Sequence, residues 1–564
     1  MENTEILKIA IKNAIDHEGK ASEGAVISKV IGQDKSVLKE IEKLKAEVSR
    51  IVGEVNTKTY PQLLDMADEA GMDLSEKKPV EPSLELKPLP NVKGRVVLRL
   101  PPEPSGYMHF GHAISFMINY LYREKYNGKL WLRFEDTNPK LLNKMDEYVD
   151  SFEEGLKWLG VKWDEKKFIS SDMELIYSYG EKLIQDSMAY VCLCTVEEIK
   201  AKRLTGNACK HREQSIGKNI ELWGELKSGK MNDGEAIVRF KYDMDSKDFA
   251  LRDPSIFRII KNDYKPYSLW PIYDFASVIE DHVCGVTHIL RSSEFKVNVQ
   301  DKLREAMDLN HPNILQYGRY NFKGTPFSKR KIRALIKEGY IRGWEDIRLP
   351  TLTAIRRRGI QPEAIKEFVL SVGYSGSQHE YSWDLLFTLN RRIIDERAKR
   401  FFFVSDPVSL NVVGAKEAEA RLQSHPSKEL GLRIIKTSGK FFIERKDLEN
   451  VKAGDVIRLK DLYDIKLKEK TGAGAVAEFC SSEFDGKEKI IHWVTDDNVK
   501  TKVTIVGALL NDDESFNKDS LKVVDGLGER SLQQVKKGDI VQFERFGFCI
   551  LDDDKTRDFI FISR

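Results

Sequence analysis

The spacing of hydrophobic residues changes several times along the chain, and each change marks a different kind of element. At the N-terminus, segments 4–15 and 36–55 repeat apolar residues at intervals of three and four, which predicts amphipathic helices. Residues 74–94 then bring four prolines among scattered charges, a composition typical of a linker. The pattern therefore predicts a helical N-terminal module over residues 1–73, joined by this linker to the remainder.

Short apolar runs and amphipathic segments alternate in the next part of the chain. Residues 96–100 and 129–135 have the length and composition of strands, whereas 113–128 and 145–160 have the helical period. We expect the first helix to end at Gly128, because glycine commonly follows the last helical turn. The order strand, helix, strand, helix predicts a parallel sheet covered by helices.

The pattern changes twice more toward the C-terminus. Residues 185–310 mix helical and strand patterns, and residues 329–400 are mainly helical in period. Beyond about residue 401, short apolar runs are separated by turns rich in Gly and Asp, which predicts a β-barrel or sandwich. The predicted fold class is therefore a multi-domain α/β protein with an all-β C-terminal part.

Composition places the chain among globular proteins. It has 564 residues, of which 41% are hydrophobic and 32% charged, so several domains are expected. The sequence lacks an apolar run of about 18 residues, so we expect no membrane span. The N-terminus lacks the order of a signal peptide, and six cysteines do not make a disulfide framework. These features predict a cytoplasmic protein with reduced cysteines.

Local charge is more informative than the net charge of +2. Basic segments occur at 328–342, 355–359 and 391–400. Any one of them could be a solvated helix face. Three such segments close together favour a track for a polyanion such as a nucleic acid.

The segment "PPEPSGYMHFGHA" holds two histidines three residues apart, between a predicted strand and a predicted helix. Gly106 and Gly111 allow the backbone to approach a ligand, and a helix N-terminus offers free N–H groups. Here His109 and His112 could donate hydrogen bonds to nucleotide phosphates. The spacing alone also fits two surface residues or a metal-binding pair.

This segment resembles the HIGH signature of class I aminoacyl-tRNA synthetases, in the glutamyl/glutaminyl subgroup with its PPEP-type lead-in, although Phe110 occupies the second motif position. The resemblance implies a Rossmann-like catalytic domain. It also implies activation of an amino acid by ATP with Mg²⁺, followed by transfer to tRNA.

A second signature of the same family, KMSKS-like, is present as "TPFSKRK" at 325–331. Ser328, Lys329 and Arg330 match it, whereas Pro326 and Phe327 replace its first two positions. The resemblance implies a loop whose lysine offsets the charge that builds up on pyrophosphate. Alone, such a triplet is commonly surface charge.

The resemblance also implies an amino-acid pocket. Glu135 in "RFEDTNP" would hold the substrate's α-ammonium group, and Tyr273 in "WPIYDFASVIEDH" would face the amino acid. Arg291 in "THILRSSEF" stands where glutaminyl enzymes carry a small uncharged residue, so a guanidinium there favours glutamate. Arg99 is a second candidate for the same carboxylate. Each of these residues could instead belong to a structural ion pair or an aromatic core.

The nucleotide site implied by the resemblance takes in further residues. Ser292 would lie near the ribose, and Arg319 and Tyr320 near the adenine. The full implied ATP-binding set is Glu103, Pro104, Ser105, Gly111, Ser292, Arg319, Tyr320 and Arg330.

Cysteine spacing indicates a metal site. Cys192 and Cys194 are two apart, and Cys209 and His211 follow with the same spacing. Three thiolates and an imidazole match a closed tetrahedral Zn²⁺ site, although buried free cysteines with a surface histidine would give the same pattern. The other three cysteines are expected in the core: Cys284, Cys480 and Cys549.

Together the motifs resemble archaeal-type glutamyl-tRNA synthetases. The implied partners are L-glutamate and tRNA, bound at its acceptor stem and anticodon, by a monomer with no membrane contact. A glutaminyl enzyme and a non-catalytic tRNA-binding protein are the alternatives, and charging of tRNA(Gln) as well stays open. The predicted divisions are the helical module (1–73), the linker (74–94), the first half of the catalytic domain (95–188), an inserted acceptor-binding domain with the zinc site and part of the amino-acid pocket (189–300), the second half (301–340), a helical connecting region (341–400) and anticodon-binding β-barrels (401–564).

Overall fold

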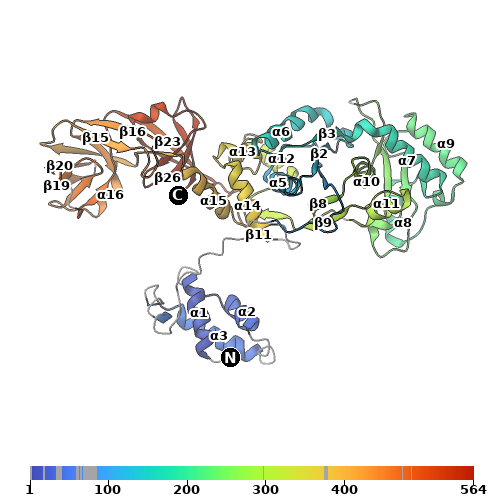
Figure 1. Ribbon diagram of the computed structural model, residues 1–564, viewed down its shortest axis with the longest axis horizontal. Coiled ribbons are helices and arrows are strands. Elements are labelled where there is room, and N and C mark those ends of the chain that lie inside the picture. Colours follow the sequence, from blue (N-terminus) through green and yellow to red (C-terminus); the bar gives the residue numbers. More distant parts are fainter. Residues whose placement is uncertain are drawn as a thin grey trace. The chain divides into compact units, whose positions relative to one another are not determined.

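The computed structural model describes most of the chain as two compact units, Met1–Leu84 and Glu85–Arg564. Figure 1 shows the helices and strands of both units. The described residues are 3–16, 20–33, 41–58, 62–63, 66–67, 86–263, 265–295, 297–373, 379–472, 474–483 and 486–564. None of the helices in these ranges is long and apolar enough to cross a membrane.

The N-terminal unit consists of helices packed around a small apolar core, coloured blue in Figure 1. Helices α1 (Asn3–Asp16), α2 (Glu23–Gln33) and α3 (Ile41–Val55) form it. On α3, every third or fourth residue from Leu44 to Val55 is buried, as an amphipathic helix requires. The helices predicted here are confirmed, but residues 36–40 and most of the predicted linker lie outside the described residues.

A parallel sheet forms the centre of the second unit. Strands β1 (Val97–Leu100), β2 (Lys129–Phe134) and β3 (Glu165–Phe168) are paired in parallel in that order. Strands β8 (His288–Ser292) and β9 (Asn313–Tyr317) make a second parallel pair. The predicted parallel arrangement is confirmed.

The three-stranded sheet and the β8–β9 pair join edge to edge. The backbone N–H of Thr287 donates to the carbonyl of Val97 at 3.0 Å, and the Val97 N–H donates to the Thr287 hydroxyl at 2.9 Å. Strand β8 therefore continues the sheet of β1, β2 and β3, although residues 189–300 were expected to belong to the inserted domain. The carboxyl ends of β1, β2, β8 and β9 consequently meet along one edge.

Helices α5 (Phe110–Lys125) and α6 (Met145–Trp158) lie beside β2 and β3 (Figure 1). Helix α5 ends before the predicted position: Asn127, with φ 45°, takes the left-handed conformation expected of a glycine. Gly128 serves another purpose, since a Cβ atom there would lie 2.5 Å from the Val96 carbonyl oxygen. The close start of β2 against β1 requires that glycine.

An antiparallel sheet with its own helices follows β3, in green in Figure 1, where α7 and α9 lie side by side. Its strands are paired in the order β4, β5, β6, β7 and share one apolar core with the surrounding helices. The elements are α7 (Met173–Gln185), β4 (Ala189–Cys192), α8 (Val196–Thr205), α9 (Ile216–Lys227), β5 (Ile237–Phe240), β6 (Ser255–Ile259), β7 (Leu269–Pro271), α10 (Tyr273–Val283) and α11 (Asn298–Met307).

Helices dominate the segment after β9, as predicted. The elements are β10 (Tyr320–Phe322), α12 (Lys329–Lys337), α13 (Leu352–Arg357), α14 (Pro362–Val372), β11 (His379–Tyr381) and α15 (Trp383–Asp395). Thr351 caps α13 through its hydroxyl, and the preceding Pro350 carbonyl accepts from the N–H of Phe110 at 2.8 Å. This contact ties the start of α5 to the helical segment.

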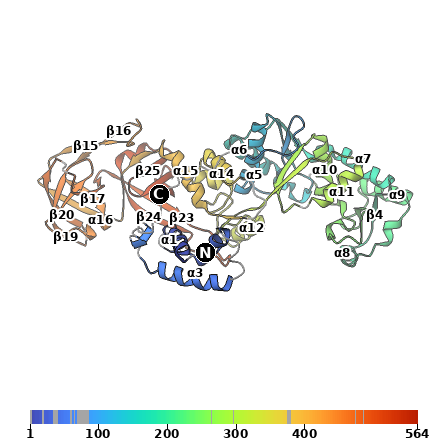
Figure 2. The same ribbon diagram turned by 60° about the horizontal axis from the view of Figure 1, so that its bottom comes forward.

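Residues beyond 398 form two seven-stranded sheets within the described ranges, which confirms the predicted all-β character. One sheet lies wholly within 407–495 and appears in orange in Figure 2. Its strands are β14 (Pro407–Val413), β17 (Lys440–Glu444), β18 (Val456–Leu459), β19 (Asp464–Thr471), β20 (Gly474–Ser481), β21 (Lys489–Ile491) and β22 (Val494–Thr495), accompanied by the hairpin β15 (Ala418–Gln423) and β16 (Leu432–Thr437) and by helix α16 (Arg445–Glu449).

The other sheet takes strands from both sides of that segment. Its members are β12 (Lys399–Phe401), β13 (Phe403–Ser405), β23 (Asn498–Val506), β24 (Leu521–Glu529), β25 (Ile540–Phe543), β26 (Gly547–Asp553) and β27 (Asp558–Ser563). Strand β12 pairs with β25, and β13 pairs with β24. The 407–495 sheet is therefore an insertion within this one.

Candidate active site

A cavity of about 550 Å³ opens where the carboxyl ends of β1, β2, β8 and β9 meet the start of α5. Most of the residues predicted for catalysis and binding line it: Arg99, Glu103, His109, Gly111, His112, Glu135, Tyr273, Arg291, Ser292, Arg319, Tyr320 and Lys329. Four predicted residues do not line it: Pro104, Ser105, Ser328 and Arg330. Residues distant in sequence thus converge on one site.

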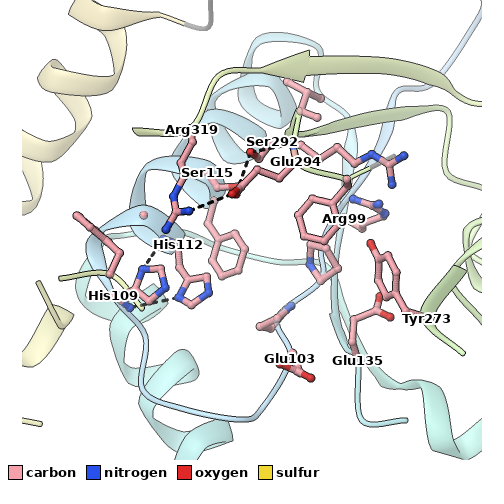
Figure 3. A pocket seen from close by; sticks show the side chains of 18 of the residues that line it. Arg99, Glu103, His109, His112, Ser115, Glu135, Tyr273, Ser292, Glu294 and Arg319 are labelled. Atoms are coloured by element: carbon pink, nitrogen blue, oxygen red, sulfur yellow. Dashed lines mark hydrogen bonds and ion pairs between the residues drawn. The ribbon is translucent and has the colours of Figure 1, made fainter. Parts of the chain in front are cut away.

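The two histidines form one end of the cavity (Figure 3). Their rings stack with centroids 3.7 Å apart. The N–H of His112 donates to His109 Nδ1 at 3.4 Å, and the N–H of His109 donates to His112 Nδ1 at 3.3 Å. Because both Nδ1 atoms accept, each neutral ring carries its proton on Nε2. Each imidazole is therefore fixed as a hydrogen-bond donor through Nε2.

The charge state of this pair follows from its surroundings. Burial lowers the pKa of His109 to about 3, and the nearby positive charges of Lys329 and Arg319 act in the same direction. Burial also lowers the pKa of His112 well below its usual value. Both rings are consequently neutral near pH 7, and both are available as donors without carrying charge.

Lys329 approaches the cavity from the first turn of α12. Its ammonium group donates to the Ser105 hydroxyl and lies 3.7 Å from Glu103 Oε2. The predicted loop is thus the start of a helix, with Ser328 as its N-cap residue and with Ser328 and Arg330 exposed. Ser105 takes part indirectly, because it holds Lys329 at the rim.

The opposite end of the cavity contains Glu135, Tyr273 and Arg99 (Figure 3). Glu135 Oε1 accepts from Arg133 Nη2 at 2.9 Å, whereas Oε2 is buried with no hydrogen-bond partner among the described residues. Burial raises the pKa of Glu135, and the charges of Arg133 and Arg99 oppose that shift. A carboxylate oxygen that faces a cavity without a partner is a site for a cationic or donor group.

Arg99 lines the cavity and is paired with a buried carboxylate. Its Nε donates to Asp281 Oδ1 at 2.8 Å, and both side chains are about 99% buried. Asp281 also accepts from Arg133 and from Arg304, so one carboxylate compensates several guanidinium groups. The Arg99 charge is therefore already paired, although its Nη2 has no partner in the described part of the chain.

Arg291 has no such carboxylate. Its Nη1 donates to the Gln300 side-chain oxygen at 2.9 Å, while Nε and Nη2 are buried and without partners across the described ranges. Burial lowers the pKa of Arg291. A buried guanidinium that lacks an ion pair and borders a cavity is suited to an anionic ligand.

Ser292, predicted near the ribose, and Arg319, predicted near the adenine, lie on the cavity wall above the histidines (Figure 3). Arg319 forms an ion pair with Glu294 at 3.0 Å, and the Glu294 N–H donates to the Ser292 hydroxyl at 3.4 Å. Tyr320 is buried and donates to the Gly373 carbonyl at 2.9 Å. Polar groups therefore surround this end as well.

Sequence reasoning missed several residues of the site. Asp281, the hub of the buried arginines, lies in the apolar helix pattern of α10, where a charged residue on the buried face was the available signal. Arg258 lines the cavity from β6, and its Nε has no partner among described residues. No motif pointed to Arg258. Glu294 stood beside the predicted Ser292 without being assigned a role.

The predicted metal ligands come together in the antiparallel domain. Cys192, Cys194, Cys209 and His211 are buried, and their ligand atoms lie within 4.8 Å of one another. The Cys192 and Cys209 sulfurs are 3.7 Å apart, and His211 Nδ1 lies 3.5 Å from Cys194 Sγ and 3.9 Å from Cys192 Sγ.

These distances fit a closed metal site. A tetrahedron with Zn–S bonds of about 2.3 Å and Zn–N bonds of about 2.0 Å has edges of about 3.8 Å between sulfurs and about 3.5 Å between sulfur and nitrogen. Of the remaining cysteines, Cys284 and Cys549 are buried as expected, but Cys480 is exposed. The expectation that Cys480 is a core residue was wrong.

A family model described as tRNA synthetases class I (E and Q), catalytic domain, matches residues 95–396. Two models of the anticodon-binding domain of the same class match residues 398–483 and 490–552. The chain therefore belongs to the class I tRNA synthetases of the E and Q group.

Curated relatives are more specific than the class. A glutamate–tRNA ligase from Pyrococcus furiosus is 38% identical over 97% of this chain and 96% of the relative. One from Methanocaldococcus jannaschii is 36% identical over 98% of both. The chain was also compared with the crystal structure of a glutamate tRNA ligase from Elizabethkingia meningosepticum in complex with its amino acid. The match covers 53% of this chain and 70% of that chain, at 19% sequence identity. Its TM-score of 0.40 is too low to bear on the fold.

Proposed function

We propose that the chain is a glutamate–tRNA ligase, which activates L-glutamate with ATP and transfers it to the 3′ end of tRNA(Glu). The observation that carries this proposal is the buried guanidinium of Arg291, which faces the cavity without a carboxylate partner in the described residues. Family membership and the names of the curated relatives support the same reaction.

The amino acid would be held at both of its charged ends. Glu135 Oε2 would accept from the α-ammonium group, with Tyr273 beside it. Arg291 would donate from Nε and Nη2 to the γ-carboxylate, and Arg99 would add one donor from Nη2. Glutamine offers a single acceptor and an NH₂ group that cannot pair with a guanidinium, so it is the disfavoured substrate.

Activation needs positioning and charge stabilisation. ATP would enter as its Mg²⁺ complex, and a glutamate α-carboxylate oxygen attacks the α-phosphorus while the bond to the pyrophosphate oxygen breaks. The Nε2–H groups of His109 and His112 would donate to the phosphate oxygens, and Lys329 would offset the charge on the leaving pyrophosphate. The proposed ATP contacts are Glu103, Gly111, Ser292, Arg319 and Tyr320. Of the other residues expected to bind ATP, Pro104, Ser105 and Arg330 do not line the cavity, and Ser105 would act through Lys329.

Transfer follows at the same centre. A ribose hydroxyl at the tRNA end attacks the glutamyl carbonyl carbon, and AMP leaves. The two anticodon-binding matches at 398–483 and 490–552 support tRNA as the partner. We assign acceptor-stem binding to the antiparallel domain, stem contact to the helices of 341–400 and anticodon contact to the β sheets, in a cytoplasmic monomer.

A structural Zn²⁺ ion completes the proposal. Three thiolates and one imidazole form a donor set that zinc prefers, and four protein ligands leave no open position for substrate. Bound there, the ion would fix the segment of 192–211 beside β4. Its contribution would be to the stability of the domain.

Charging purified tRNA(Glu) and tRNA(Gln), each with glutamate and with glutamine, tests this function. We expect glutamate on tRNA(Glu), and the second tRNA shows whether the enzyme also charges tRNA(Gln). A preference for glutamine would instead identify the glutaminyl alternative. Absence of any charging by a folded protein would identify a non-catalytic tRNA-binding protein.

A further inference from the structure

The guanidinium of Arg291 is positioned by a neutral residue. Arg291 is 5% exposed, and its one hydrogen bond among the described residues goes from Nη1 to Gln300 Oε1 at 2.9 Å. Gln300, on α11, is 1% exposed. The other two donor positions of the guanidinium remain unpaired at the cavity. Gln300 thus holds one edge of Arg291 and leaves the other edge for a ligand.

The orientation of the Gln300 amide is itself fixed. Its Nε2 donates to Asp274 Oδ1 at 3.0 Å, so the amide nitrogen faces a carboxylate and the amide oxygen must face Arg291. Asp274 lies in the first turn of α10, directly after the pocket residue Tyr273. A chain of two hydrogen bonds therefore runs from Asp274 through Gln300 to Arg291.

Arg99 illustrates the alternative, in which a carboxylate positions the guanidinium. Its guanidinium contacts the carboxylate of Asp281 at 2.8 Å, so its charge is compensated before any substrate arrives. An amide gives the same geometric support as a carboxylate but leaves the positive charge of the guanidinium intact. Arg99 is thus held by a carboxylate and Arg291 by an amide.

We infer that Gln300 is a positioning residue that sets the preference of this site for an anionic side chain, by orienting Arg291 without neutralising it. This inference rests on the proposed function, because it assigns the basis of glutamate selection at the same site. Asp274 also contributes to this positioning, since its hydrogen bond with Gln300 fixes which end of the amide faces Arg291.

The decisive variant is Gln300→Glu, which keeps the shape of the side chain and adds a negative charge next to Arg291. ATP–pyrophosphate exchange with tRNA present would give the glutamate KM, the ATP KM and the Ki of glutamine as a competitor. We expect the glutamate KM to rise about tenfold or more, because the guanidinium is already paired. The ATP KM should stay within about threefold of the parent, since it does not depend on that charge, and the glutamine Ki should not rise, because the amide no longer faces an unpaired charge.

Two further variants separate charge from packing. Gln300→Met is neutral and of similar length but cannot accept a hydrogen bond from Arg291, so the orientation of Arg291 is lost while its charge is kept. Its ratio of glutamine Ki to glutamate KM should therefore fall less than that of Gln300→Glu. The double variant Asp274→Asn with Gln300→Glu removes the repulsion between two adjacent carboxylates. If the glutamate KM stays raised in the double variant, the effect arises at Arg291 and not from repulsion between the two adjacent carboxylates.

The outcomes are distinct. A Gln300→Glu enzyme with the parental ratio contradicts the inference, and so does an equal loss in Gln300→Met, which would show that the added charge has no effect of its own. If the parent enzyme itself does not use glutamate, the proposed function fails, and that result is read before any variant is compared.

Discussion

The cavity and the cysteine cluster are both built from buried polar residues, but they satisfy those residues in opposite ways. In the cavity, atoms of Glu135 and Arg291 are buried without partners in the described chain. In the cluster, the ligand atoms of Cys192, Cys194, Cys209 and His211 face one another within 4.8 Å. Buried polar atoms without partners are suited to a substrate that binds and is released. Four ligand atoms that face one another are suited to a permanently bound metal ion. Removing a residue should therefore affect activity at the first site and stability at the second.

The largest effect is expected from His112→Ala or Lys329→Ala. Each removes a donor aimed at developing phosphate charge, so the rate of adenylate formation should fall by about 10²- to 10³-fold while the protein stays folded. ATP–pyrophosphate exchange measures the rate, and tRNA binding should be near normal. His311→Ala and Lys337→Ala are matched controls, because both residues are exposed and neither lines the cavity. Parental rates in both test variants would remove the nucleotide-site assignment.

Arg291→Ala should come next. Because the γ-carboxylate then loses a buried charged partner, kcat/KM for glutamate should fall by about 10²-fold. The KM for ATP serves as the internal control and should change little. Thermal unfolding should be almost unchanged, since no ion pair of Arg291 is found in the described residues. An enzyme that keeps its glutamate kinetics and still rejects glutamine would make Arg99 the leading candidate.

Cys209→Ser tests the closed site. Undialysed parent protein should contain about one Zn²⁺ per chain, and the variant should lose most of it and unfold several degrees lower. Elemental analysis and thermal unfolding measure the two effects. Cys480→Ser is the matched control, because Cys480 is exposed and outside the cluster. Parent protein without metal would leave the four residues as packing groups.

The smallest effect is expected from pH, through the protonation state of His109 in the free enzyme. With a folded pKa of about 3, His109 should stay neutral from pH 8 down to about pH 4, and ¹⁵N NMR of labelled histidine would report this state. In unfolded chains histidine gains its proton near pH 6.5, so the unfolded state binds more protons as the pH falls. Stability should therefore decline from about pH 6.5 toward pH 3. A transition of His109 near pH 6.5 in the folded enzyme would contradict the buried, neutral pair.

Much of the fold could be predicted because periodicity reports local structure directly. The parallel strands, the helices of 329–400 and the all-β C-terminal part each follow from residues adjacent in sequence. The junction between β1 and the start of β8 could not, because it depends on a contact between Val97 and Thr287. The end of α5 was also misplaced, since Asn127 adopted the conformation expected of Gly128.

The site residues likewise divide into those that sequence motifs could predict and those that depend on contacts between distant elements. His109, His112 and Lys329 belong to short motifs, and motifs are local. Asp281, Gln300 and Asp274 act through partners that the fold brings to them from other elements, so the sequence could not identify those partners. For the same reason, sequence could not show that Arg99 is paired with a carboxylate while Arg291 is not.

The nesting of one β sheet inside another has a consequence for synthesis on the ribosome. All strands of the 407–495 sheet emerge consecutively, so that sheet can form while the last residues are still being translated. The surrounding sheet begins with β12 and β13 but needs β24 and β25, more than a hundred residues later, to pair them. Until then, the edges of two short strands stay open to wrong partners. Early folding of the inserted domain shortens the effective loop between them, so the order of translation favours correct closure.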